Sequence, residues 1–164
     1  MLVEALDANP GAGMAFGLVT PFGDDAVKLQ EQADYFRRAA IRASRLHSAQ
    51  QLAACLVYCN PVLINSACIA RRTVFEKVGG FDDSIPVCED ADFWARMALA
   101  SDYLFIQKSL VEYRTGASSL MHNLAPNDAR VPESYRQIQA KYSMAVGVLP
   151  ALAFKIWCRV FLRA

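Results

Sequence analysis

The sequence is poor in histidine, has no Cys-x-x-Cys pair and carries almost no excess charge. Its 164 residues include two histidines and five cysteines, and these do not cluster with the ligand spacing of a zinc site. The formal net charge of +1 argues against a nucleic-acid binder driven by bulk charge. The first residues carry acids and no basic segment, which does not fit a signal peptide. The cysteine pattern fits a reduced, cytosolic setting.

Apolar residues are plentiful enough for one domain with a core of its own. They make up 54% of the chain against 20% charged residues, which excludes a disordered or fibrous protein. Apolar patterning predicts strands over residues 14–20, 62–69, 103–107 and 110–114. It predicts helices over residues 26–58 with a break near 44–48, over 74–78, from about 90 to 100 and over 133–144. Strands and helices in this order indicate an α/β domain with a mixed sheet and flanking helices.

The tail, residues 145–164, is apolar but does not fit a membrane-spanning helix. Pro150 breaks it, and Lys155, Arg159 and Arg163 recur every four residues beside an apolar face. This pattern is typical of a basic amphipathic helix at a membrane surface. The same pattern also fits a helix that packs on its own domain or on another part of a longer one. We therefore separate a domain over residues 1–144 from a helical tail over residues 145–164.

Two local signals describe the short helix before the Gly-Gly turn. Thr73 and Glu76 have capping-box spacing, so Thr73 is expected to cap the start of this helix. Gly79 is expected to end it, because glycine enters the left-handed conformation without a Cβ clash. Gly80 completes the turn that follows.

The run C-E-D-A-D-F-W, Cys88 to Trp94, holds three acids and spells Asp-x-Asp. Two such carboxylates can share a hard divalent cation, but on a helix Asp90 and Asp92 would point about 200° apart. No buried strand of the kind that a metal pair needs precedes them. Acids in the first turn also interact favourably with exposed N–H groups, and Asp90 is a suitable N-cap. From the run alone we favour this capping role, with Asp92 as an ordinary first-turn acid.

The acidic run belongs to a longer, ordered set of motifs. An apolar stretch leads into R-R-T-V-F-E-K-V-G-G-F-D-D, E-D then opens a helix with an aromatic-Trp pair and an arginine, and L-V-E-Y-R closes the set. In this order and spacing, the set resembles the second half of a family 2-like glycosyltransferase domain of GT-A fold. The resemblance covers roughly residues 60–114. It implies a partial GT-A-like α/β domain.

The resemblance also implies an inverting transfer of a sugar from a nucleotide-sugar donor to an acceptor hydroxyl. Asp90 becomes the candidate general base that takes the proton of the attacking hydroxyl, with Glu89 beside it. The helix N-terminus is expected to lower the pKa of Asp90. Gly79 and Gly80 are expected to form a tight turn beside the acceptor cleft.

Trp94 and Arg114 are the remaining substrate-binding candidates, and both have a second interpretation. Trp94 either offers an apolar face to a sugar or lies in the core as part of the apolar stripe of its helix. Arg114, like Arg96, either contacts a phosphate or forms a structural salt bridge.

Two parts of the family pattern have no counterpart in this sequence. One is the nucleotide-binding half, which ends in a metal-binding Asp-x-Asp. The other is a histidine that often follows the Tyr-Arg strand; here His122 comes several residues after Tyr113-Arg114. The Mg or Mn cation therefore belongs to the complete family domain, and no metal site is assigned to this chain. We expect the acceptor-side portion of such an enzyme to be inactive as an isolated chain.

The implied partners are a nucleotide-sugar donor and a glycan or lipid-linked acceptor, with no nucleic acid. The expected location is the cytoplasm or the inner face of the membrane. The alternative function is a non-catalytic binding or assembly module. It would act at a membrane surface through residues 145–164, or together with a separate nucleotide-binding chain.

Overall fold

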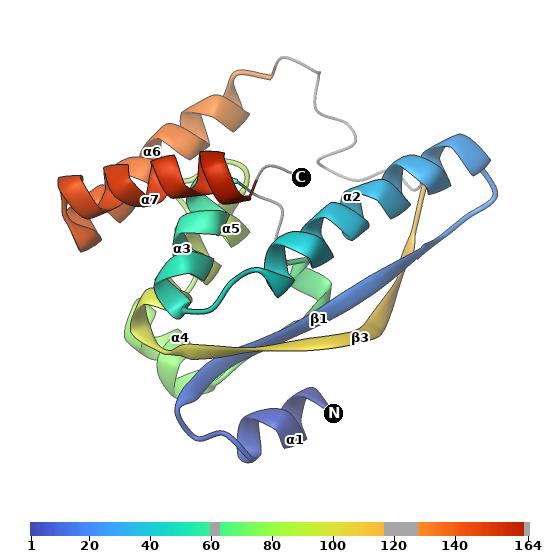
Figure 1. Cartoon of the computed structure of the whole chain (residues 1–164), viewed down its shortest axis with the longest axis horizontal. Coiled ribbons are helices and arrows are strands. Elements are labelled where there is room, and N and C mark those ends of the chain that lie inside the picture. Colours follow the sequence, from blue (N-terminus) through green and yellow to red (C-terminus); the bar gives the residue numbers. More distant parts are fainter. Residues whose placement is uncertain (60–62, 117–127, 163–164) are drawn as a thin grey trace.

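The computed structural model describes residues 1–59, 63–116 and 128–162. Within them, helices lie on both faces of a small sheet (Figure 1). The strands are β1 (Ala12–Phe22), β2 (Cys68–Ala70) and β3 (Asp102–Arg114). The α-helices are α1 (Leu2–Asp7), α2 (Ala26–Ser44), α3 (Ala49–Tyr58), α4 (Arg72–Val78), α5 (Glu89–Ala100), α6 (Arg130–Val146) and α7 (Val148–Phe161), and a short 3-10 helix spans Asn65–Ala67.

The sheet has the order β2-β1-β3 in the described part of the chain. β2 runs antiparallel to β1 and β3 runs parallel to it, so the expected α/β domain with a mixed sheet is confirmed. β3 is one strand where the sequence predicted two. Gly17 lies opposite Ile106 but Leu18 lies opposite Ser109, so the expected break is a bulge within the strand.

The expected helices are present, with one local correction at the start of α4. The break near residues 44–48 separates α2 from α3 as expected, and Ser48 caps α3 by accepting from the Gln51 N–H. Thr73 does not cap α4, because this helix begins at Arg72, two residues before the expected start at residue 74, and its N-cap Arg71 makes no side-chain capping hydrogen bond. The guanidinium of Arg71 instead donates to the carbonyls of Ala12 and Leu6, which ties the start of α4 to β1 and α1.

The strand predicted over residues 62–69 is much shorter than expected. Asn65–Ala67 form a 3-10 turn and only Cys68–Ala70 pair with β1. Asn65 and Ser66 are turn-forming residues, because their side chains compete with the backbone for hydrogen bonds, and this outweighs the apolar run. Residues 60–62 lie outside the described part of the chain.

The core follows the two faces of β1. Met14 and Phe16 are fully buried under the large helical layer, while Ala15 points to the other face and packs with Leu6 of α1. This alternation is the period of two that a strand imposes. Figure 1 shows α1 below the sheet and α2, α3, α5 and α7 above it. The main core therefore lies between β1 and the upper helices.

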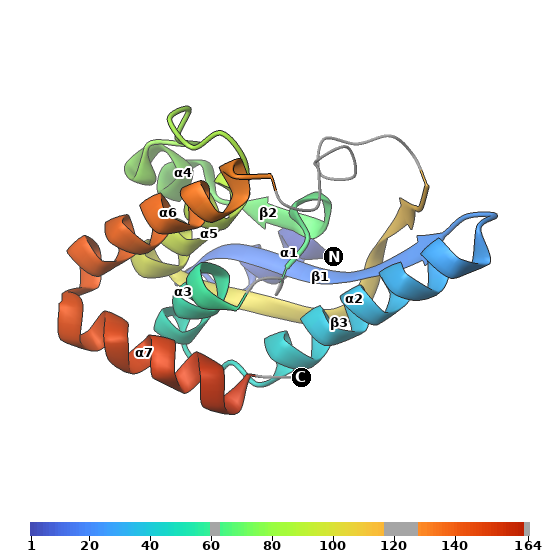
Figure 2. The same cartoon turned by 90° about the horizontal axis from the view of Figure 1, so that it is seen from above.

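The C-terminal tail forms α7, which lies beside α6 and over α3 (Figure 2). Ala151, Cys158 and Leu162 of this segment are buried in the main core. The boundary expected at residue 145 falls in the last turn of α6, which runs to Val146. Arg163 of the tail lies outside the described residues. None of the described helices is long and apolar enough to cross a membrane.

Candidate functional site

The acidic run forms the first turn of α5, but Asp90 is not its N-cap. The N-cap is Cys88, the only non-glycine residue with positive φ in the described chain, and its side chain makes no capping hydrogen bond. The Asp90 carboxylate accepts from the N–H of its own neighbour Ala91 at 2.8 Å. A left-handed residue just before the helix therefore places Glu89 and Asp90 in the first turn, one after the other.

Asp90 is half-buried, and this changes its expected acidity. Burial raises the pKa of its carboxyl, the adjacent charge of Glu89 raises it further, and the backbone N–H groups lower it less. The expectation of a lowered pKa at this helix terminus is thus wrong, because desolvation outweighs the contribution of the first-turn N–H groups. Glu89 itself is exposed.

The charge of Asp90 acts on two titratable residues from other elements. Burial raises the pKa of Tyr35 on α2 to about 12, with the Asp90 charge as the next cause. Burial also raises the pKa of the Cys68 thiol on β2, and the Asp90 charge adds to that effect. The carboxylate therefore lies near a phenol and a thiol that both stay protonated at neutral pH. Neither neighbour was singled out in the sequence, since their proximity arises only from the packing of α2 and β2.

Asp92 is not an ordinary first-turn acid. Its side chain is 3% exposed, and its two oxygens pair with different cations, Oδ1 with Lys141 at 2.7 Å and Oδ2 with Arg96 at 2.8 Å. Lys141 comes from α6, which the sequence pattern does not connect with the acidic run. Both oxygens of Asp92 thus pair with cations, whereas the Asp90 carboxylate accepts a hydrogen bond from the backbone. The two carboxylates therefore lie in different electrostatic environments.

Gly79 and Gly80 lie on the Asp92 side of α5. Gly79 ends α4 in the left-handed conformation at φ 83°, as expected. Arg96 donates to the carbonyls of Val78 and Gly80, so Arg96 forms a structural salt bridge that also holds this turn. The turn borders a cavity of about 390 Å³ whose charged lining is Asp82, Asp83, Arg96 and Lys141. Neither Asp90 nor Glu89 lines this cavity.

The other two substrate-binding candidates lie apart from this turn. Trp94 is 4% exposed and its indole N–H donates to Asn65 Oδ1 at 2.9 Å. Its rings pack against Phe93 in the core, so no face of Trp94 is open to a sugar. Arg114 is exposed at the end of β3, with its guanidinium 5.5 Å from the ring centre of Phe22. His122 lies outside the described residues.

Three thiols gather where α3 meets α7. The sequence places Cys55 and Cys59 on one helical face, and the packing of α7 adds Cys158, which is fully buried. Hydrogen bonds from the Cys158 and Cys55 thiols lower the pKa of Cys59. All five cysteines are free. Among the described residues, no group of three His, Cys, Asp or Glu side chains is placed to hold a metal ion.

A further cavity lies away from the acidic run. It measures about 730 Å³ and lies between the turn after α1, the link from α2 to α3 and the start of β3. His47, Asp102 and Tyr103 are the titratable residues in its lining. No local motif marked these residues, because they meet only where the three segments converge.

Comparisons with protein-family models, with curated proteins and with solved structures each found no match to this chain.

Proposed function

We propose that this chain carries the acceptor side of an inverting glycosyltransferase and that Asp90 is its general base. The observation that carries the proposal is the half-buried Asp90 carboxylate at the start of α5, whose pKa is raised and whose neighbour is the exposed Glu89. A carboxylate with a raised pKa is a stronger base than a solvated one, and it needs no large rearrangement to accept a proton. The reaction class, sugar transfer with inversion, is proposed from the resemblance of the ordered motifs around Asp90 to a family 2-like glycosyltransferase.

The proposed chemistry requires little of this chain beyond position and proton transfer. The acceptor oxygen attacks the anomeric carbon of the donor sugar, and its proton passes to an Asp90 oxygen. The nucleoside diphosphate leaves with the electrons of the bond that joined it to the anomeric carbon. Glu89 lies beside the base, where it can contact the acceptor and where its charge raises the Asp90 pKa. Asp92 is excluded from this role because Lys141 and Arg96 occupy its two oxygens.

A partial GT-A-like fold is part of the proposal. The mixed sheet and the packing of α5 against β1 are consistent with it. The donor-binding residues and the Mg or Mn cation would come from a nucleotide-binding segment that pairs with this one. We assign no donor-binding role to Arg114, and the buried Trp94 is withdrawn as a sugar contact.

The test measures sugar transfer by this chain assembled with the nucleotide-binding half of a family 2-like glycosyltransferase. Asp90→Asn keeps the size of the side chain and its acceptor for the Ala91 N–H, but removes the base. We expect turnover to fall by about 100-fold or more, the usual contribution of general base catalysis. Asp7→Asn, which changes an exposed acid on α1, is the matched control and should leave turnover unchanged.

Retained turnover in a folded Asp90→Asn variant would overturn the role of Asp90 and leave it a structural residue of α5. The isolated chain should transfer no sugar above background. If the isolated chain were as active as the assembled one, the division into donor and acceptor sides would be wrong.

A further inference from the structure

The outer face of α7 is a continuous apolar surface. Large apolar side chains that are between 52% and 79% exposed recur along it at helical spacing, and they are Val148, Leu149, Leu152, Ile156, Val160 and Phe161. Met144, at the end of α6, extends the same surface with 78% of its side chain exposed. These seven residues, which we call the α7 face, are half of the exposed large apolar residues in the described chain. A concentration of this kind marks an interaction surface.

The α7 face is exposed although the helix itself is firmly packed. Ala151, Cys158 and Leu162 on the opposite side are buried in the main core, and Phe154 and Trp157 pack against it. Arg42 and Arg45 of α2 donate to the carbonyls of Leu162 and Phe161, which holds the C-terminal end of the helix. The orientation of α7 is therefore determined by its buried side, and the residues of the α7 face are left exposed. The helix itself lies at the edge of the molecule (Figure 2).

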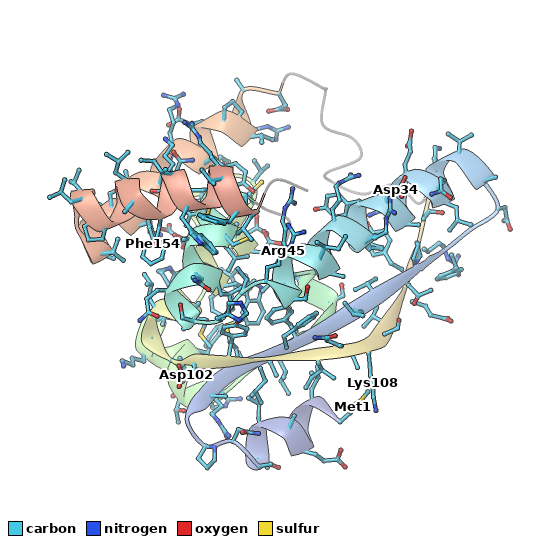
Figure 3. All side chains as sticks on the ribbon, in the orientation of Figure 1. Met1, Asp34, Arg45, Asp102, Lys108 and Phe154 are labelled. Carbon is cyan, nitrogen blue, oxygen red and sulfur yellow. The ribbon has the colours of Figure 1, made fainter. Side chains whose placement is uncertain are left out.

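The charged side chains on α7 itself have one sign. No Asp or Glu follows Glu133 in the sequence, whereas Lys155 and Arg159 lie on α7. Lys155 Nζ lies 5.7 Å from the ring centre of Tyr58, and Arg159 is exposed. Figure 3 shows Arg45 next to the end of α7, while the acid Asp34 lies near the middle of α2, farther from α7. An apolar strip bordered by cations matches the acyl boundary and headgroups of an anionic lipid surface.

We propose that the α7 face docks this protein on an anionic membrane, with α7 lying in the plane of the interface. A second copy of the chain is a poorer occupant, because a two-fold contact would place the Lys155 and Arg159 charges of both copies against one another without acids to pair them. None of the described helices can cross a bilayer, so the contact is peripheral. The inference does not depend on sugar transfer.

The test is co-sedimentation of the full chain with vesicles of phosphatidylcholine alone and of phosphatidylcholine with 30 mol% phosphatidylglycerol. We expect binding to the anionic vesicles, little binding to the neutral ones, and weaker binding as salt is raised. The double variant Leu149→Ser/Ile156→Ser should bind at least about tenfold more weakly, since it removes apolar contact area. Arg159→Gln should weaken binding about fivefold, as expected for one cation near the surface.

The matched control is Val3→Ser/Val27→Ser, which removes two apolar side chains of similar exposure from α1 and α2 and should bind as the native chain does. Circular dichroism melting shows whether each variant is folded. Three results would overturn the proposal: no binding of the native chain to anionic vesicles, undiminished binding of the folded double variant, or a dimer in light scattering that the double variant dissociates. Because the readout is membrane binding, its failure is distinct from failure of the proposed transferase role.

Discussion

Asp90 and Asp92 are the same residue type two positions apart, and their surroundings are opposite. Asp90 has a backbone hydrogen bond, a like-charged neighbour and a raised pKa. Asp92 is buried between two cations. An ion pair satisfies a buried charge, whereas partial burial without a cation leaves the ionised form of Asp90 unfavourable. Of the two carboxylates, only that of Asp90 therefore has an unfavourable ionised form that proton uptake would relieve.

Asp90→Asn is therefore expected to stabilise the fold at pH 7. The folded-state pKa of Asp90 lies above the ordinary pKa of an aspartate, so the folded protein binds its proton more tightly than the unfolded chain does. The ionised form consequently costs stability above the folded pKa, and this cost disappears as the pH falls through the folded pKa toward the unfolded value. Urea unfolding of native and variant chains between pH 7 and pH 3.5 should show a stability gain that shrinks with decreasing pH.

A loss of stability that is equal at every pH would identify Asp90 as a capping residue instead. Glu89→Gln serves as the control, because neutralising the exposed Glu89 side chain should change the stability of the fold little by itself. Removal of the Glu89 charge should also lower the pKa of Asp90 toward the usual range.

At the scale of elements, two helix ends determine the approach to the candidate site. α4 ends at Gly79 in the left-handed conformation, and α5 begins after the left-handed Cys88. Glycine enters this conformation freely, whereas for Cys88 the conformation is strained and is maintained by its surroundings. The local sequence therefore determines where α4 ends, whereas the packing of the fold determines where α5 begins.

Gly79→Ala tests the local stop of α4. A Cβ at this position would meet no atom within 4 Å, so the cost comes from the backbone conformation alone. We expect the free energy of unfolding to fall by about 1 kcal/mol in urea denaturation. Gly11→Ala is the matched control, since it lacks a positive φ and has an open contact at 3.9 Å, and it should change stability by less than about 0.5 kcal/mol. An equal effect of both substitutions would contradict the assigned role.

At the scale of the molecule, Asp92 connects three parts of the fold. Lys141 of α6 pairs with Asp92 and with Asp82 in the loop after α4, while Arg96 pairs with Asp92 and holds the carbonyls of the Gly79-Gly80 turn. The network attaches α6, and with it α7, to the side of α5 opposite the proposed base. It therefore fixes where the apolar α7 face lies relative to Asp90.

Asp92→Asn is expected to be the most destabilising of the acid-to-amide changes in the acidic run. It leaves Lys141 and Arg96 without their buried anion, although both cations are partly exposed and keep other partners, so we expect a loss of about 2 kcal/mol. Urea denaturation measures the loss, with the exposed Asp83→Asn as the control at less than about 0.5 kcal/mol. A loss no larger than that of the control would show that the network contributes nothing to the stability of the fold.

Local sequence determined the helices, their ends near residues 44–48 and at Gly79, the mixed α/β class and the two-sided character of α7. These features depend on hydrophobic periodicity and on the backbone preferences of single residues, and both can be recognised from a few neighbouring positions in the sequence. Only the tertiary structure decided that Trp94 is buried and donates to Asn65, that Asp92 pairs with Lys141, and that Cys158 joins Cys55 and Cys59. It also decided that the charge of Asp90 acts on Tyr35 and Cys68. Burial and ion pairing depend on which segments meet, and a partner 49 residues away from Asp92 leaves no mark on the sequence around it.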